Sequence, residues 1–190
     1  MEYIDQIEKL YNYLECNLQL YLVRSVFKLK HNFNNDCNLL GCFLKDYLTI
    51  KNYEKTVDEY NLCEEFISYF EAESSKLPSE YIINDMIKFG NYYLSIVFED
   101  IRNSEISIAA STINSCFAIE YYPILMKIMD KFYSNSITER KLKILSESLV
   151  DVVIHNYEQA KEFSYTNDEL EKQVHITAKE KAGVLSEIGV

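Results

Sequence analysis

Apolar residues recur at alternating steps of three and four along most of the chain, which is the spacing of one face of an α-helix. From Ile4 to Leu29 this spacing holds over about eight turns and predicts one long amphipathic helix. A polar cluster follows at residues 31–36, and its side chains are expected to bond to their own backbone and cap the next helix. Residues 37–50 then predict a short and very apolar helix, which we expect near the centre of the fold.

Three pairs of a hydroxyl residue and a glutamate three positions later predict capping boxes, which satisfy amide donors where helices begin. The pairs are Thr56/Glu59, Ser136/Glu139 and Thr166/Glu169. The first pair predicts a helix whose apolar face consists of Val57, Tyr60, Cys63, Phe66, Ile67 and Phe70. The second predicts a long helix that reaches Phe163. The third predicts a final helix from about Asn167, in which residues 183–190 form a tail that could fray.

The two prolines mark further helix starts, because a proline in the first turn lacks only an N–H that would be unsatisfied there. Pro78 predicts a helix with apolar residues from Ile82 to Ile101, and Pro123 predicts one through Phe132. Between these helices, Asn103-Ser104 interrupts the chain before another helical face. That face consists of Ile106, Ala109, Ala110, Ile113 and Phe117.

Together these patterns predict an all-α fold, an irregular stack of antiparallel helix hairpins with about seven to eight helices. Four glycines and two prolines in 190 residues leave few turn makers, which disfavours all-β and Rossmann-type folds. A chain of this length with 48% apolar residues can bury one core, so we expect a single domain over residues 1–190. The polar stretch at residues 74–78 is the point where this domain could divide.

The segment from about residue 104 to residue 133 resembles one helix pair of a HEAT-type repeat. The likeness rests on the run Ile106-Ser107-Ile108-Ala109-Ala110 with Ile113, followed by Pro123, Leu125 and Ile128. It implies that the paired alanines let two helices pack closely and that the proline opens the second helix. Ser107 replaces the usual basic residue, and no second copy follows at a period of about 40–47 residues, so an irregular stack is expected rather than a solenoid.

The ends and cysteines of the sequence bear on its compartment. The chain begins Met-Glu-Tyr-Ile-Asp without a basic or apolar leader, and no apolar window is long enough for a membrane span, so we expect a cytoplasmic protein. Five irregularly spaced cysteines fit buried thiols in a reduced compartment. Cys37 and Cys42 with His31 lack the second ligand pair of a structural zinc site. We therefore expect no metal and no cofactor.

Three ionisable residues of the predicted long helix share one face, because Asp151, His155 and Glu158 follow the spacing i, i+4, i+7. Such a set could hold a metal or carry out acid–base chemistry. Metal-carboxylate bundles, however, use Glu-x-x-His pairs from two helices, and the sequence contains none. A solvated surface cluster is the favoured interpretation. Since no nucleophile motif and no phosphate-binding loop occurs either, the chain is not expected to be an enzyme.

Negative charge dominates the sequence. The formal net charge of −11 repels phosphate backbones and anionic lipids, so neither nucleic acid nor a membrane is an expected partner. Over half of this charge lies in residues 54–73, where seven acids stand against the single base Lys55. Interleaved tyrosines would add rigid contact area, which suits a basic protein partner. The candidate partner-binding residues are Glu54, Asp58, Glu59, Tyr60, Glu64, Glu65, Tyr69, Glu71 and Glu73.

In size, acidity and helical character without catalytic motifs, the chain is similar to bacterial toxin-immunity proteins. This likeness implies that it neutralises a basic partner, such as a nuclease-type toxin domain, by occluding the partner's substrate site. Two alternatives stay open. One is a helical adaptor or a viral Bcl-2-like host-interaction protein with residues 37–50 as its central helix, and the other is an unrecognised helical enzyme that uses Asp151, His155 and Glu158. The sequence predicts no oligomeric state.

Overall fold

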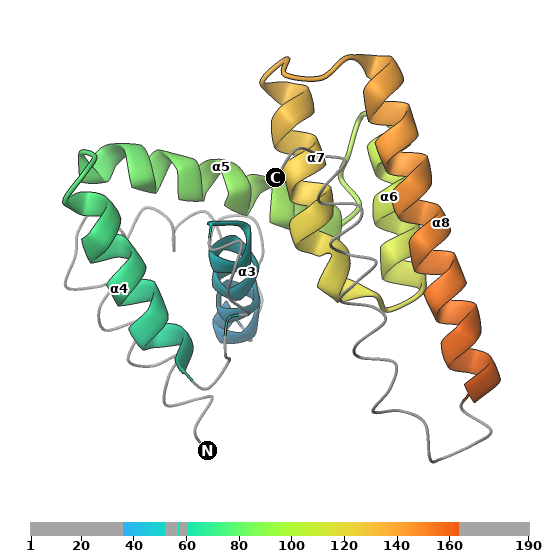
Figure 1. Ribbon diagram of the computed structural model, residues 1–190, viewed down its shortest axis with the longest axis horizontal. Helices are drawn as coiled ribbons and strands as arrows, with labels where there is room; N and C mark the ends of the chain where they lie inside the picture. The colour runs from blue at the N-terminus through green and yellow to red at the C-terminus, as the bar shows by residue number, and fades with distance from the viewer. Residues whose placement is uncertain (1–35, 52–56, 58–60, 164–190) are drawn as a thin grey trace. The chain divides into compact units, whose positions relative to one another are not determined.

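The computed structural model describes residues 36–51, 57 and 61–163 (Figure 1). These residues form six α-helices and the 3₁₀ helix η2, and none of them lies in a strand, so the prediction of an all-α fold is confirmed. The elements are α3 (Asp36–Lys51), α4 (Leu62–Ser74), α5 (Ser79–Val97), α6 (Ser104–Ser115), η2 (Ile119–Tyr121), α7 (Tyr122–Tyr133) and α8 (Glu139–Phe163). The helices predicted at residues 4–29 and from Asn167, the pairs Thr56/Glu59 and Thr166/Glu169, and the tail at 183–190 lie outside the described residues.

The chain folds as two compact units, residues 1–94 and residues 95–190. The boundary falls inside α5, between Leu94 and Ser95. The prediction of a single domain that could divide near residues 74–78 stays a prediction. Each unit has its own buried residues and is described by itself below.

In the first unit, α3 supplies the most deeply buried side chains. Phe43, Leu44, Tyr47 and Leu48 are all 0% exposed, as expected for the very apolar helix predicted there. The Phe43 ring lies 5.7 Å from the Tyr93 ring of α5, measured between centroids. Tyr69 of α4 meets Tyr47 edge-on at 5.9 Å. α3 therefore contacts both α4 and α5, which places it at the centre of the described part of this unit.

The helix predicted from Thr56 begins later than expected. Val57 is 2% exposed but lies outside any helix, and α4 starts at Leu62 after Asn61 in the N-cap position. The apolar spacing correctly indicated burial at Val57, although Val57 itself is not helical. Within α4, the predicted apolar face is present, because Cys63, Phe66 and Phe70 are all buried.

In the second unit, α6, α7 and α8 pack against one another as a bundle (Figure 1). Much of the predicted apolar faces is buried, and Ala109 and Ala110 of α6 are both 0% exposed. Asn114 ties the end of α6 to its neighbours: its Nδ2 donates to the Ile96 carbonyl at 3.0 Å, and its Oδ1 accepts from the Tyr122 hydroxyl at 2.7 Å. The likeness of residues 104–133 to a HEAT-type pair stays a prediction.

The turn after α6 corrects the prediction for Phe117. α6 ends at Ser115, and Phe117 adopts a left-handed backbone with a φ of 55°. The amides of Phe117 and Ala118 donate to the carbonyls of Asn114 and Ile113, which is the bonding pattern of a left-handed helix end. The chain reverses there, so Phe117 leaves the apolar face and its side chain is 83% exposed.

The start of α8 corrects the capping box predicted at Ser136 and Glu139. The Ser136 amide donates to the Lys131 carbonyl at 2.8 Å, because Asn135 is left-handed and the turn that ends α7 is still closing. Thr138 is the N-cap instead, and its Oγ1 accepts from the Lys141 amide at 3.3 Å. The helix begins at Glu139 and extends to Phe163, where the sequence predicts its end.

Candidate functional site

One face of α4 and its flanking residues lines an open groove of about 580 Å³. The lining residues recur at steps of one, three and four, so they share one side of the helix. They are Asn61, Glu64, Glu65, Ser68, Tyr69, Ala72, Glu73 and Lys76. The apolar face of α4 is buried in the unit, which turns these residues outward and gives the groove three carboxylates.

The structure brings together four of the five candidate partner-binding residues that it describes. Glu64 is exposed, while Glu65, Tyr69 and Glu73 are half-buried, and all four line the groove. Glu71 is exposed on α4 but is not one of the lining residues. The other candidates, Glu54, Asp58, Glu59 and Tyr60, lie outside the described residues.

Polar contacts within the unit shape the groove. Glu73 forms an ion pair with Lys76 at 2.7 Å, so this carboxylate already has a basic neighbour. The Tyr69 hydroxyl lies 3.3 Å from the Tyr47 hydroxyl of α3. Tyr69 therefore points its polar end into the unit, whereas the sequence analysis expected its phenol on the surface.

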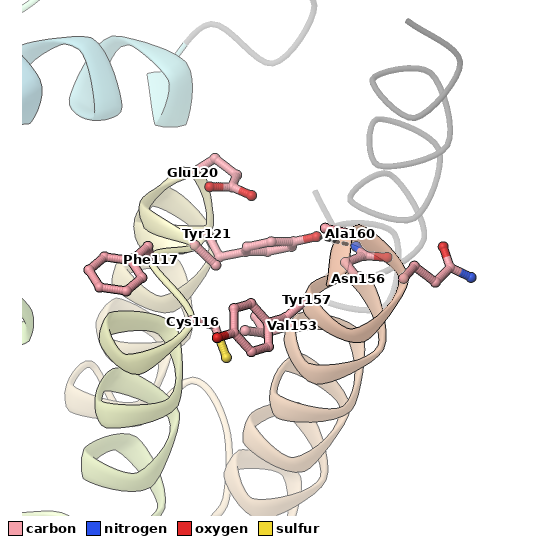
Figure 2. A pocket seen from close by; sticks show the side chains of 10 residues that line it. Cys116, Phe117, Glu120, Tyr121, Val153, Asn156, Tyr157 and Ala160 are labelled. Carbon is pink, nitrogen blue, oxygen red and sulfur yellow. Dashed lines mark hydrogen bonds between the residues drawn. The ribbon is translucent and has the colours of Figure 1, made fainter. Parts of the chain in front are cut away.

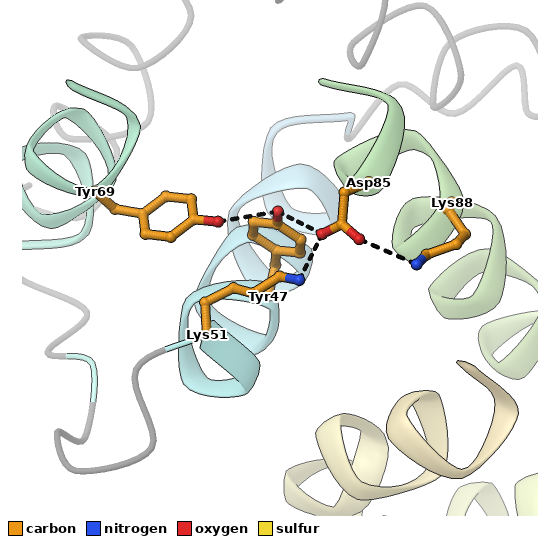
Figure 3. Close-up of polar contacts among 5 residues, drawn as sticks. All are labelled: Tyr47, Lys51, Tyr69, Asp85 and Lys88. Atoms are coloured by element: carbon orange, nitrogen blue, oxygen red, sulfur yellow. Dashed lines mark hydrogen bonds and ion pairs between the residues drawn. The ribbon is translucent and has the colours of Figure 1, made fainter. Parts of the chain in front are cut away.

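The Tyr69 hydroxyl belongs to a polar network that joins α3, α4 and α5 (Figure 3). Tyr47 donates a hydrogen bond of 2.8 Å to Asp85 Oδ2. Lys51 Nζ lies 2.6 Å from the same oxygen, and Lys88 Nζ lies 3.0 Å from Asp85 Oδ1. One carboxylate of α5 thus holds a buried phenol and two lysines, one from α3 and one from α5 itself.

The lysines of this network also contact aromatic rings. Lys51 Nζ lies 4.8 Å from the centre of the Phe89 ring and 5.3 Å from that of Tyr47, and Lys88 Nζ lies 4.8 Å from the centre of Phe89. Cations at these distances are attracted to the ring faces. The two positive charges are therefore held between the Asp85 carboxylate and aromatic rings.

The network shifts the proton equilibria of its members. Burial, followed by the negative charge of Asp85, raises the pKa of Tyr47 far above the ordinary value of 10.0. Burial and the charges of Asp85 and Glu73 raise the pKa of Tyr69, although its bond to Tyr47 acts the other way. For Asp85, burial alone would raise the pKa, but the hydrogen bond and positive charge of Lys51, helped by Lys88 and Tyr47, lower it. At neutral pH the network consists of two neutral phenols and one carboxylate.

No pattern in the sequence identifies this network. Asp85 lies next to the apolar stripe of its helix and looks like an ordinary solvated residue. One signal was present: Tyr47 lies inside a very apolar helix, and a buried tyrosine hydroxyl usually finds a partner. That signal indicates that a polar group must reach the core, but it does not identify Asp85.

The cluster of Asp151, His155 and Glu158 lies on α8, and all three residues are exposed. His155 Nε2 lies 2.9 Å from Gln159 Nε2 one turn further along the helix. No group of three His, Cys, Asp or Glu side chains that could hold a metal ion occurs in residues 36–51, 57 and 61–163. Among these residues, Cys63 is buried and Cys42 and Cys116 are half-buried, and all three are thiols rather than disulfides.

Comparisons with known proteins give no further indication of function. None of the helices in the described ranges is long and apolar enough to cross a membrane. The chain matches no protein-family model, no curated protein and no solved structure. The function must therefore be argued from the groove and the residues around it.

Proposed function

We propose that the chain is an acidic binding protein that neutralises a basic protein partner, and that the groove on α4 is its contact surface. The observation that carries the proposal is that Glu64, Glu65 and Glu73 line one open groove with Tyr69. Following the likeness to immunity proteins, we propose a nuclease-type toxin domain as the partner. A protein that covers the phosphate-binding site of a nuclease needs no catalytic residue of its own.

The exposure of the acids supports two roles in binding. Glu64 is exposed and contributes to the long-range field that attracts a positively charged protein. Glu65 is half-buried, where a charge pair formed with a partner is less screened by salt than at the open surface, and Glu73 is half-buried in its ion pair with Lys76. The Tyr69 ring adds apolar contact area between them. The groove therefore suits a segment that carries lysine or arginine side chains.

The experiment reverses two charges in the groove. The full chain is used to capture its partner from cells of its source, the captured protein is identified and purified, and binding is measured by surface plasmon resonance. The double variant Glu64→Lys/Glu65→Lys should slow association by about ten-fold or more, because steering by clustered charge raises on-rates by such factors. For the unchanged chain, the association rate should fall as salt rises.

The matched control is Glu71→Lys/Glu80→Lys. It makes the same change of net charge at two exposed positions, on α4 and α5 of the same unit, which do not line the groove. Association in this control should stay within about three-fold of the original rate, the residual effect of net charge alone. Equal losses in the two double variants would contradict a localised site, and no loss in either would contradict the acidic contact altogether.

A helical adaptor of the Bcl-2-like kind is the second candidate, and one observation favours it. Such a protein needs a central apolar helix, and α3 is deeply buried between α4 and α5. Its partner would be an amphipathic helix held by apolar contacts. Binding that persists at high salt and in Glu64→Lys/Glu65→Lys would support this candidate over the first.

A further inference from the structure

An exposed aromatic side chain and a small pocket lie side by side in the turn between α6 and α7 (Figure 2). Phe117 is 83% exposed and Ile119 is 57% exposed. The pocket has a volume of about 190 Å³ and is lined by this turn and by the second half of α8. In Figure 2, the Tyr121 ring reaches across to α8, while the Phe117 ring points away from α8.

The walls of the pocket are held in place by buried contacts. Tyr121 is 1% exposed, and its hydroxyl accepts a hydrogen bond of 2.6 Å from Asn156 Nδ2 of α8. Val153, one turn earlier on α8, is also 1% exposed. The pocket is therefore preformed, and a ligand would not have to order its walls.

The backbone conformation at Phe117 and its bulky side chain do not suit each other. A left-handed backbone is unfavourable for a bulky residue, and glycine is the usual residue at such a helix end. Burial does not offset this cost, because the side chain is almost fully exposed. Strained positions of this kind cluster at binding and catalytic sites.

The size of the pocket limits its occupant. Small-molecule sites usually enclose about 300–1,000 Å³, so this pocket is too small for most metabolites. A cavity of about 150 Å³ can hold one benzene molecule, so 190 Å³ has room for a single aromatic or branched aliphatic side chain beside the polar lining residues Glu120, Asn156 and Gln159. Such a side chain belongs to a protein partner, which would also cover Phe117 and Ile119.

We infer that this turn is a docking site for a basic segment of a protein partner, which inserts one aromatic or branched aliphatic side chain into the pocket. Glu120 is the one charged residue among the ten that line the pocket, and it is exposed. Its negative charge favours a basic segment. The site belongs to the second unit and is independent of the groove on α4.

Charge also argues against the two other occupants. A second copy of the chain would bring another net charge of −11 to the Glu120 carboxylate. Residues 164–190 carry five acids and three lysines, so the net charge of this segment has the same sign as Glu120. A basic partner is therefore the occupant that the described charges fit.

The experiment selects peptides on the full chain from a display library of random 16-residue sequences, with Phe117→Gly as the counter-selection target. Enrichment of peptides that combine lysine or arginine with one aromatic or aliphatic residue supports the inference. Phe117→Gly should weaken a selected peptide by about 30-fold, as for the loss of an anchoring aromatic residue. Glu120→Lys should weaken it as well, and Glu64→Lys/Glu65→Lys should not, which separates this site from the groove on α4.

Two measurements keep the test decisive. Phe117→Gly should melt at the same temperature as the original chain or higher, because glycine suits a left-handed position. With benzoylphenylalanine at position 117, ultraviolet light should link the full chain to the bound peptide. Cross-links to a second copy or to residues 164–190 instead would overturn the inference, as would acidic selected peptides, no enrichment, or full binding by Phe117→Gly.

Discussion

Replacing Tyr47 with phenylalanine removes one hydroxyl group from the buried network of the first unit and leaves the ring in place. The hydroxyl donates to Asp85 at 2.8 Å and lies 3.3 Å from the Tyr69 hydroxyl, and Tyr47 is 0% exposed. Without it, Asp85 loses one donor in a partly dry site, although Lys51 and Lys88 stay in contact with the carboxylate. The substitution should therefore lower the free energy of unfolding without changing the fold.

The size of the loss follows from the partners. A hydrogen bond to a charged group contributes roughly 1.5–3 kcal/mol, and a neutral one roughly 0.5–1.5 kcal/mol. The Asp85 side chain is 26% exposed, so water can replace part of the lost contact and the lower half of the range applies. We expect about 2 kcal/mol for Tyr47→Phe, which corresponds to about a 30-fold change in an equilibrium constant.

Hydrogen exchange followed by mass spectrometry measures this loss locally. Amides of α3 and α5 that exchange through opening of the first unit should lose protection by about 30-fold, while peptides from residues 98–160 in the second unit serve as a reference. Tyr69→Phe should cost less, roughly 0.5–1 kcal/mol, since its hydroxyl reaches a neutral partner at 3.3 Å. Tyr81→Phe, at a side chain that is 67% exposed, should change nothing measurable. Unchanged protection of α3 in Tyr47→Phe would contradict this prediction, and so would an equal loss of unfolding free energy in Tyr47→Phe and Tyr69→Phe.

Three further predictions concern pH and a helix start. The folded pKa of Asp85 lies below its ordinary value of 3.8, so the carboxylate stabilises the fold above pH 3.8, and this stabilisation is lost as the pH falls further. The free energy of unfolding of Asp85→Asn should therefore fall less steeply in acid than that of the original chain, as measured by urea titrations followed by circular dichroism. The folded pKa of Tyr47 is raised, so the neutral phenol stabilises the fold fully below pH 10.0, and this stabilisation is lost as the pH rises further. Above pH 10.0, Tyr47→Phe should therefore lose less stability than the original chain. Thr138→Ala should lower the free energy of unfolding by about 1 kcal/mol in the same titrations, and Ser136→Ala should lower it by less than about 0.5 kcal/mol, because Thr138 caps α8. The reverse order would support Ser136 as the N-cap residue.

The buried faces of the helices could be predicted from the sequence because burial and helical geometry leave the same spacing in it. Leu142, Leu145 and Leu149 follow this spacing in α8, and all three are at most 1% exposed. Helix ends follow a different rule, since they depend on backbone conformation at single residues. Three non-glycine residues in the described part of the second unit have a left-handed backbone: Asn135 is a residue type that tolerates this conformation, whereas Glu99 and Phe117 are not. Periodicity therefore placed Phe117 on the apolar face of α6, although the helix ends two residues earlier, at Ser115.

The candidate site was predictable only in part, and Tyr69 shows why. Charge density along the sequence indicates α4, but it cannot separate Glu71 from Glu64 and Glu65, because that distinction depends on which side of α4 packs on the unit. Tyr69 belongs to both environments: its ring lines the groove, and its hydroxyl contacts Tyr47 beside Asp85. The network that fixes α4 on α3 therefore also sets the direction in which the acids of the groove point. It follows that Tyr47→Phe should loosen the groove as well as the unit, so a partner that binds there should dissociate faster from this variant even though Tyr47 itself is buried and cannot touch it.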